Sequence, residues 1–304
     1  MSAFGWQDRP VRLTVSGRTD PGMRRSENQD GFLVAELHED TDGALLDSAR
    51  TAGGAGEVVL GPRGLLAVVA DGMGGASGGS LASRLALETI HRTLRERWSP
   101  DRNHSPQQFT LRLREAVERA NDAVHGESLR DSRHRGMGTT ATAAGFLDGF
   151  LYLAQVGDSR AYLVRRGRAV QLTRDQSLVQ ELVDAGTMTP EEAERSGQGN
   201  VLLQAVGPEP SVRVELTYQE MRRGDVVVLC SDGLFRVVRT EEIAGAAARA
   251  PDAAALCEEL VRTANERGGP DNVTVVAVRA DGAGLDEPRE GDPVGRQVLA
   301  PSGA

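Results

Sequence analysis

The chain has 304 residues, 39% of them hydrophobic, which is enough apolar content for a substantial core and excludes wholesale disorder. Its formal net charge of -9 disfavours nucleic acid as a partner, because phosphate backbones bind positive surfaces. Two cysteines are too few for a disulfide framework, and no segment approaches the roughly 18 apolar residues of a membrane span. We therefore expect a cytoplasmic protein that does not bind membranes.

Apolar patterning in the first quarter of the chain predicts three strands. Alternating apolar residues indicate a strand over 11–19, and a second candidate covers 31–37. Residues 38–63 are rich in Gly, Ala and Asp, which predicts a mobile surface insertion. The continuous apolar run over 64–70 is typical of a strand buried on both faces, and we expect this strand to stop at Asp71.

Two helices are predicted next. Apolar residues recur near one face of 80–98. The second helix has a clear start signal, because Ser105 can act as N-cap, Pro106 takes the first helical position and Gln108 can close a capping box. Both helices are amphipathic, so each is expected to cover a sheet.

The rest of the chain is dominated by strand patterns. Asp148-Gly149 and Arg166-Gly167 separate β-rich runs within 139–172, and such pairs favour two-residue hairpins. Further strands are predicted over 212–218, 225–231 and 273–279, with helices at about 176–185, 190–195 (after a start signal at Thr189-Pro190), 240–249 and 252–267.

This element order lacks the βαβ alternation of a parallel sheet. It predicts an α+β fold, a four-layer α/β/β/α sandwich in which two antiparallel sheets are flanked by helices. The tail over 281–304 has little apolar content and is predicted to be disordered.

Three aspartates lie where apolar strand runs end or begin. Asp71 follows GLLAVVA, Asp232 follows DVVVLCS, and Asp271 precedes NVTVVAV. A strand end holds a short carboxylate with little rotamer freedom, and hard divalent cations prefer oxygen ligands. We interpret the three as metal ligands. The alternative is that they are independent loop aspartates that cap helices or turns, because Asp-Gly pairs are common.

Seven motifs follow one another along the chain. They are TDPGMRRSENQDGF at 19–32, VVADGMGG at 68–75, GMGTTATAA at 136–144, AQVGDSRAYLVRRG at 154–167, LTRDQSLVQELVDAG at 172–186, VVLCSDGLFRVV at 227–238 and GGPDNVTVVAV at 268–278. Together and in this order they resemble the bacterial branch of the type 2C (PPM) metal-dependent protein phosphatase family. The resemblance implies a catalytic domain over 1–280, with the insertion at 38–63 and a flap at about 173–210.

The resemblance also implies a site for two Mn²⁺ or Mg²⁺ ions. Asp71 would bridge the two ions, and Asp232 and Asp271 would complete the protein ligands of the first. The backbone carbonyl of Gly72 would bind the second ion, with Asp30 close by. Two neighbouring ions can present a shared water for in-line attack on phosphorus.

The implied reaction is hydrolysis of phosphoserine and phosphothreonine in proteins. Arg25 would hold the substrate phosphate, and Asp158 together with Asp232 would hold a weaker third ion. The implied partners are phosphorylated proteins, including Ser/Thr kinases that the enzyme opposes and the substrates of those kinases. The protein is expected to act as a monomer.

Three residues depart from the pattern of the family. Gln29 stands where many members carry Glu, Met73 stands where eukaryotic members place a histidine proposed as general acid, and Gln176 replaces a common histidine. Gln29 leaves open a second reading, a phosphoprotein-binding module without turnover. A third reading, a metal-dependent phosphodiesterase or nuclease, lacks the basic surface expected of it.

Overall fold

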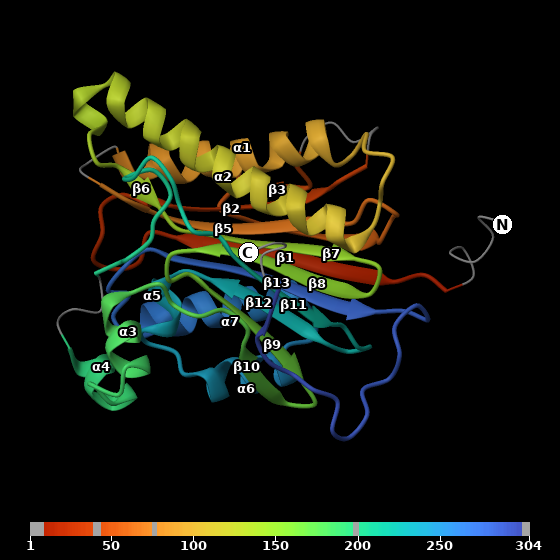
Figure 1. Ribbon diagram of the computed structural model, residues 1–304. Coiled ribbons are helices and arrows are strands. Elements are labelled where there is room, and N and C mark those ends of the chain that lie inside the picture. The colour runs from red at the N-terminus through yellow and green to blue at the C-terminus, as the bar shows by residue number, and fades with distance from the viewer. Residues whose placement is uncertain (1–8, 39–43, 75–77, 197–200, 300–304) are drawn as a thin grey trace.

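Two antiparallel sheets lie face to face, and helices cover the outer face of each sheet in the computed structural model (Figure 1). Helices α1 (Gly78–Arg97) and α2 (Pro106–Arg130) lie on one side, and α6 (Thr240–Arg249) and α7 (Ala253–Glu266) lie on the other. The predicted four-layer α+β sandwich is confirmed. The structure describes residues 9–38, 44–74, 78–196 and 201–299.

One sheet has six strands in the order β10-β9-β12-β13-β1-β4. Helix α7 packs on β1 and β13, and its buried leucines contribute to the core on that side. The strands are β1 (Arg12–Asp20), β4 (Gly53–Val59), β9 (Arg160–Arg165), β10 (Arg168–Gln171), β12 (Val226–Cys230) and β13 (Val273–Asp281).

The other sheet has the order β14-β11-β8-β7-β5-β2-β3, and β6 pairs with β5 at one end. Helices α1 and α2 pack on its outer face. The strands are β2 (Asp30–Glu36), β3 (Leu46–Asp47), β5 (Leu65–Met73), β6 (Gly138–Thr139), β7 (Ala141–Leu147), β8 (Phe150–Val156), β11 (Glu215–Glu220) and β14 (Gln297–Val298).

Strand β5 shows why its sequence is apolar throughout. Successive side chains of a strand point to opposite faces of the sheet. Ala67 and Val69 pack between the two sheets, whereas Val68 and Ala70 pack in the cluster beneath α1 and α2. All four are completely buried, so the strand is enclosed on both faces, as predicted.

The two hairpin turns form as predicted. Asp148 and Gly149 have φ angles of 53° and 77°, and Arg166 and Gly167 have 51° and 73°, which is the left-handed pair that a type I′ turn requires. At the start of α2, the Ser105 hydroxyl accepts from the Gln108 N–H as predicted. The Gln108 side chain does not close the capping box, because the Ser105 N–H donates to Asn103 Oδ1 instead.

The predicted insertion is largely built into the sheets. Residues 44–63 contain β3 and β4, and β4 pairs with β1 in continuous register from Arg12↔Val59 to Arg18↔Gly53. A Gly- and Ala-rich segment has weak strand propensity, so the hydrogen bonds offered by the β1 edge decide its conformation. Residues 39–43 lie outside the described part of the chain.

The tail was also predicted wrongly, at least up to residue 299. Leu285 is buried, β14 pairs with β11, and the Arg296 guanidinium makes two hydrogen bonds to the Glu215 carboxylate. These contacts are made with strands distant in sequence, so low local hydrophobicity did not reveal them. Residues 300–304 lie outside the described part.

Short helical turns occur near the candidate site. The predicted flap segment carries α3 (Leu178–Asp184) and α4 (Pro190–Arg195), and the Thr189–Glu192 capping box starts α4. Helix α5 (Asp232–Phe235) and a 3₁₀ turn (Ser132–His134) are too short to give a periodic pattern. Residues 197–200 of the flap are not described. No helix within the described ranges is long and apolar enough to cross a bilayer.

Candidate metal and phosphate site

Four aspartates from both sheets meet at one end of the sandwich. Asp30 begins β2 and pairs directly with Asp71 on β5, so these two carboxylates come from neighbouring backbone positions. Asp232 begins α5 just after β12, and Asp271 lies two residues before β13. Strands β12 and β13 pair with one another, which brings the second two aspartates to the same sheet edge. The strand-end rule used on the sequence therefore gave the right neighbourhood.

Strand β5 continues past Asp71, contrary to the prediction that it would stop there. Gly72 pairs with Thr139 of β6, and the Gly72 N–H donates to the backbone carbonyl of Gln29. A Cβ at position 72 would lie 2.2 Å from the Gly79 carbonyl oxygen and 2.6 Å from that of Gln29. Only glycine fits where these three backbone segments pack together.

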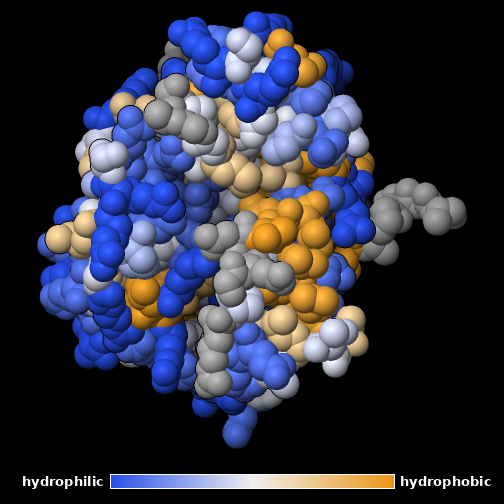
Figure 2. Space-filling model, turned by 90° about the vertical axis from the view of Figure 1, so that its left-hand side faces the viewer, coloured by the Kyte–Doolittle hydropathy of each residue, from blue (hydrophilic) through white to orange (hydrophobic). Residues whose placement is uncertain are grey.

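The pocket between these elements has a volume of about 490 Å³. It lies at the end of the molecule that faces the viewer in Figure 2, a mostly hydrophilic face interrupted by a hydrophobic area near its centre. Six of the seven predicted site residues line the pocket: Arg25, Asp71, Gly72, Asp158, Asp232 and Asp271. Asp30 lies deeper, 9% exposed, and lines a second cavity between β2 and α1.

The carboxylates are short of protein partners. The Ser231 hydroxyl donates to Asp30 Oδ2 at 2.6 Å, but Asp30 Oδ1 is buried without a hydrogen-bond partner. Burial raises the pKa of Asp30 to about 7, and burial followed by repulsion from Asp30 and Asp232 raises that of Asp71 well above its usual value. Clustered buried carboxylates of this kind are stabilised by a cation, and an all-oxygen donor set suits Mg²⁺ or Mn²⁺.

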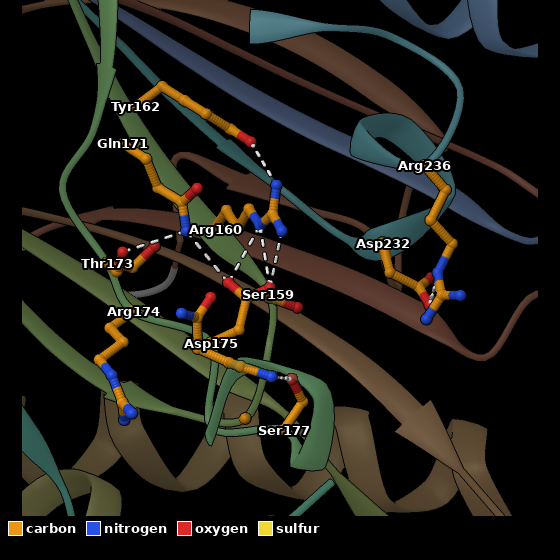
Figure 3. Close-up of polar contacts among 12 residues, drawn as sticks. Ser159, Arg160, Tyr162, Gln171, Thr173, Arg174, Asp175, Ser177, Asp232 and Arg236 are labelled. Atoms are coloured by element: carbon orange, nitrogen blue, oxygen red, sulfur yellow. Dashed lines mark hydrogen bonds and ion pairs between the residues drawn. The ribbon is translucent and has the colours of Figure 1, made fainter. Parts of the chain in front are cut away.

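Two arginines partly neutralise the cluster. Arg25 Nη2 lies 2.8 Å from Asp271 Oδ2, and Arg236 Nε lies 2.8 Å from Asp232 Oδ2 (Figure 3). No three His, Cys, Asp or Glu side chains in the described ranges are already spaced to hold a metal ion. To ligate an ion, Asp271 would turn from Arg25 toward it, whereas Asp232, which meets Arg236 at Oδ2, has a second carboxylate oxygen to offer.

The sequence analysis missed Arg236 and a network next to it. Arg160 pairs with Asp175 at the base of the flap through contacts of 2.7 and 3.0 Å (Figure 3). It also lies 3.7 Å over the Phe235 ring of α5. This arginine therefore joins β9, the flap and the helix that carries Asp232. The i,i+4 spacing of Asp232 and Arg236 is a recognisable signal only once α5 is known to be helical.

Comparison with known proteins agrees with this architecture. Residues 55–274 match the family described as Protein phosphatase 2C. The chain belongs to this family. It is 38% identical over 265 residues to the serine/threonine protein phosphatase PstP of Mycobacterium tuberculosis, covering 87% of this chain and 44% of PstP. It is 35% identical over 266 residues to the protein phosphatase PhpP of Streptococcus pneumoniae, covering 88% of this chain and 97% of PhpP.

Solved structures of the family superpose on most of the chain. The crystal structure of M. tuberculosis PstP gives a TM-score of 0.71 at 33% identity, covering 89% of this chain and 99% of that one. A serine/threonine phosphatase from S. agalactiae gives 0.74 at 31% identity, covering 88% and 99%. The PstP catalytic domain in complex with two manganese ions gives 0.70 at 32% identity, covering 89% and 99%. This phosphatase 2C chain spans less than half the length of full PstP.

Proposed function

We propose that this protein is a metal-dependent protein serine/threonine phosphatase. The observation that carries the proposal is the convergence of four aspartates and Arg25 at one end of a phosphatase 2C fold. Relatives over most of the chain are protein phosphatases by name. The proposed substrates are phosphoserine and phosphothreonine residues of proteins.

Two divalent ions are proposed to be held by Asp30, Asp71, the Gly72 carbonyl, Asp232 and Asp271. The partnerless Asp30 Oδ1 and the raised pKa of Asp71 support this assignment, because both features are relieved by a bound cation. When bound, two such ions supply a nucleophilic water at neutral pH and offset charge on the phosphoryl oxygens.

Arg25 is proposed to bind the phosphate of the substrate. Its side chain is 55% exposed and lines the pocket, where it forms an ion pair with the Asp271 carboxylate at 2.8 Å. A planar guanidinium can donate two parallel hydrogen bonds to phosphoryl oxygens. A phosphate that takes Arg25 would release Asp271, so substrate binding and metal ligation by Asp271 would favour one another.

The chain offers no cysteine nucleophile as an alternative. Cys230 and Cys257 are both buried, and burial raises the pKa of each thiol to about 12. The thiolate, not the thiol, attacks phosphorus, so neither residue can form a phosphoenzyme near neutral pH. This supports direct attack by water.

We further propose that the enzyme opposes bacterial Ser/Thr kinases in the cytoplasm and acts as a monomer. The proposal for the kinases rests on the phosphoprotein substrates of a protein phosphatase. The proposals for location and oligomeric state rest on composition.

The test is hydrolysis of a phosphothreonine peptide by purified protein with Mn²⁺ and with EDTA. We expect turnover only with the metal. Asp232→Ala should lose it, whereas Asp281→Ala, which removes a carboxylate 75% exposed, should retain it. Equal rates in EDTA would exclude metal-dependent chemistry, and phosphopeptide binding without turnover would favour a non-enzymatic module.

A further inference from the structure

Asp158 and Asp232 are two carboxylates that line the same pocket. Asp158 lies in the turn between β8 and β9, is 6% exposed and lines the same pocket as Asp232. Because both carboxylates line one pocket, their negative charges repel one another. Such a pair calls for a positive charge, and the resemblance of the sequence to the phosphatase family implies a third metal ion there.

Arg236 already brings a positive charge to this pair. It follows α5 directly and lies four residues after Asp232, so its guanidinium reaches back along the helix to the Asp232 carboxylate at 2.8 Å (Figure 3). It lines the pocket and is 31% exposed. Asp158 lines the same pocket, so the charge of Arg236 acts on both members of the pair.

The second arginine near the pair, Arg160, binds other residues. Arg160 binds Asp175 through three hydrogen bonds and donates to the Tyr162 hydroxyl (Figure 3). It also packs on the Phe235 ring. These contacts fix its guanidinium at the base of the flap and away from the pocket lining. Arg236, which lines the pocket and contacts Asp232, is therefore the arginine placed to neutralise the pair.

We propose that Arg236 replaces the third metal ion as a resident cation, so that this protein binds two divalent ions and not three. A guanidinium held at Oδ2 of Asp232 repels a divalent ion that would be shared between this oxygen and Asp158. The pair is thereby neutralised without a weakly bound ion. This inference rests on the proposed two-metal function.

The number of Mn²⁺ ions that the protein binds tests this inference without a measurement of activity. Protein stripped with EDTA and dialysed is titrated with Mn²⁺ by calorimetry, and free Mn²⁺ is counted by electron paramagnetic resonance. We expect two bound ions for the wild type and three for Arg236→Gln. The third ion of the variant should bind at least about tenfold more tightly than any third ion of the wild type, and a tenfold difference in affinity corresponds to one pK unit of interaction. Arg236→Lys keeps the charge and should keep two.

Matched controls separate this site from a general loss of charge. Arg262→Gln removes an arginine from an exposed i,i+4 pair with Glu266, at 2.7 Å, and should leave two ions. Adding Asp158→Asn to Arg236→Gln should abolish the third ion. A third ion in the wild type with the affinity seen in Arg236→Gln, or only two ions in Arg236→Gln, would overturn the inference. Either result leaves the first two ions in place, whereas a wild type that binds no Mn²⁺ overturns the proposed function as well.

Discussion

The buried Asp30 carboxylate is expected to make the metal-free protein less stable as pH rises. Burial raises its pKa to about 7 in the folded protein from an ordinary value of 3.8, so the folded state holds the proton more tightly than the unfolded state does. The stability contributed by this proton is complete below pH 3.8 and is lost as pH rises through 7. The difference between the two pKa values corresponds to about 4 kcal/mol of folding stability, of which about 3 kcal/mol is lost between pH 5 and pH 8.

Replacing Asp30 by Asn removes the ionisable group, and with it the loss of stability at high pH, while keeping a side-chain oxygen that accepts from the Ser231 hydroxyl. In EDTA, Asp30→Asn should therefore be more stable than the wild type at pH 8, by up to about 4 kcal/mol, and the difference should shrink toward pH 5. With Mn²⁺ present the order should reverse, because a bound ion stabilises the ionised wild type.

Urea denaturation in EDTA at pH 5, 6, 7 and 8 measures the difference directly. Asp281→Asn, at a carboxylate 75% exposed, is the matched control and should follow the wild type at each pH. If wild type and Asp30→Asn lose the same stability between pH 5 and pH 8, then the strained carboxylate cluster inferred from burial does not exist in the metal-free protein.

Three further changes have defined outcomes. Arg25→Ala should lower kcat/KM by about a hundredfold in steady-state kinetics, with incomplete recovery in Arg25→Lys, because one positioned charged donor is lost; a full recovery by Lys would argue against bidentate binding. Asp225→Ala should lower the free energy of unfolding, measured in urea, by about 3–5 kcal/mol. The change leaves the buried guanidinium of Arg165, 4% exposed, without its two hydrogen bonds to the Asp225 carboxylate at 2.7 and 2.8 Å. A loss below about 1 kcal/mol would contradict this. Gln29→Glu should shift the Mn²⁺ titration to about tenfold lower concentration through one added charge near the metal ligands, and an unchanged titration would exclude that role.

The sequence alone determined the fold class, the main helices and strands, and the residues that gather at the site. Strand β5 is apolar at every position because both its faces are buried, and its end carries Asp71. The type I′ turns and the Ser105 cap depend on neighbouring residues only, so local chemistry was sufficient to find them.

Only the tertiary structure decided the features that depend on distant segments. Strand β4 and the ordered tail up to residue 299 exist because β1 and β11 offer hydrogen-bonding edges, which no local pattern of Gly, Ala and Pro encodes. The same holds for the electrostatics of the site. Asp30 pairs with Asp71 because of the register between β2 and β5, and Arg236 reaches Asp232 because one turn of helix separates them. The partners of a carboxylate are set by such distances in space and not by its place in the chain.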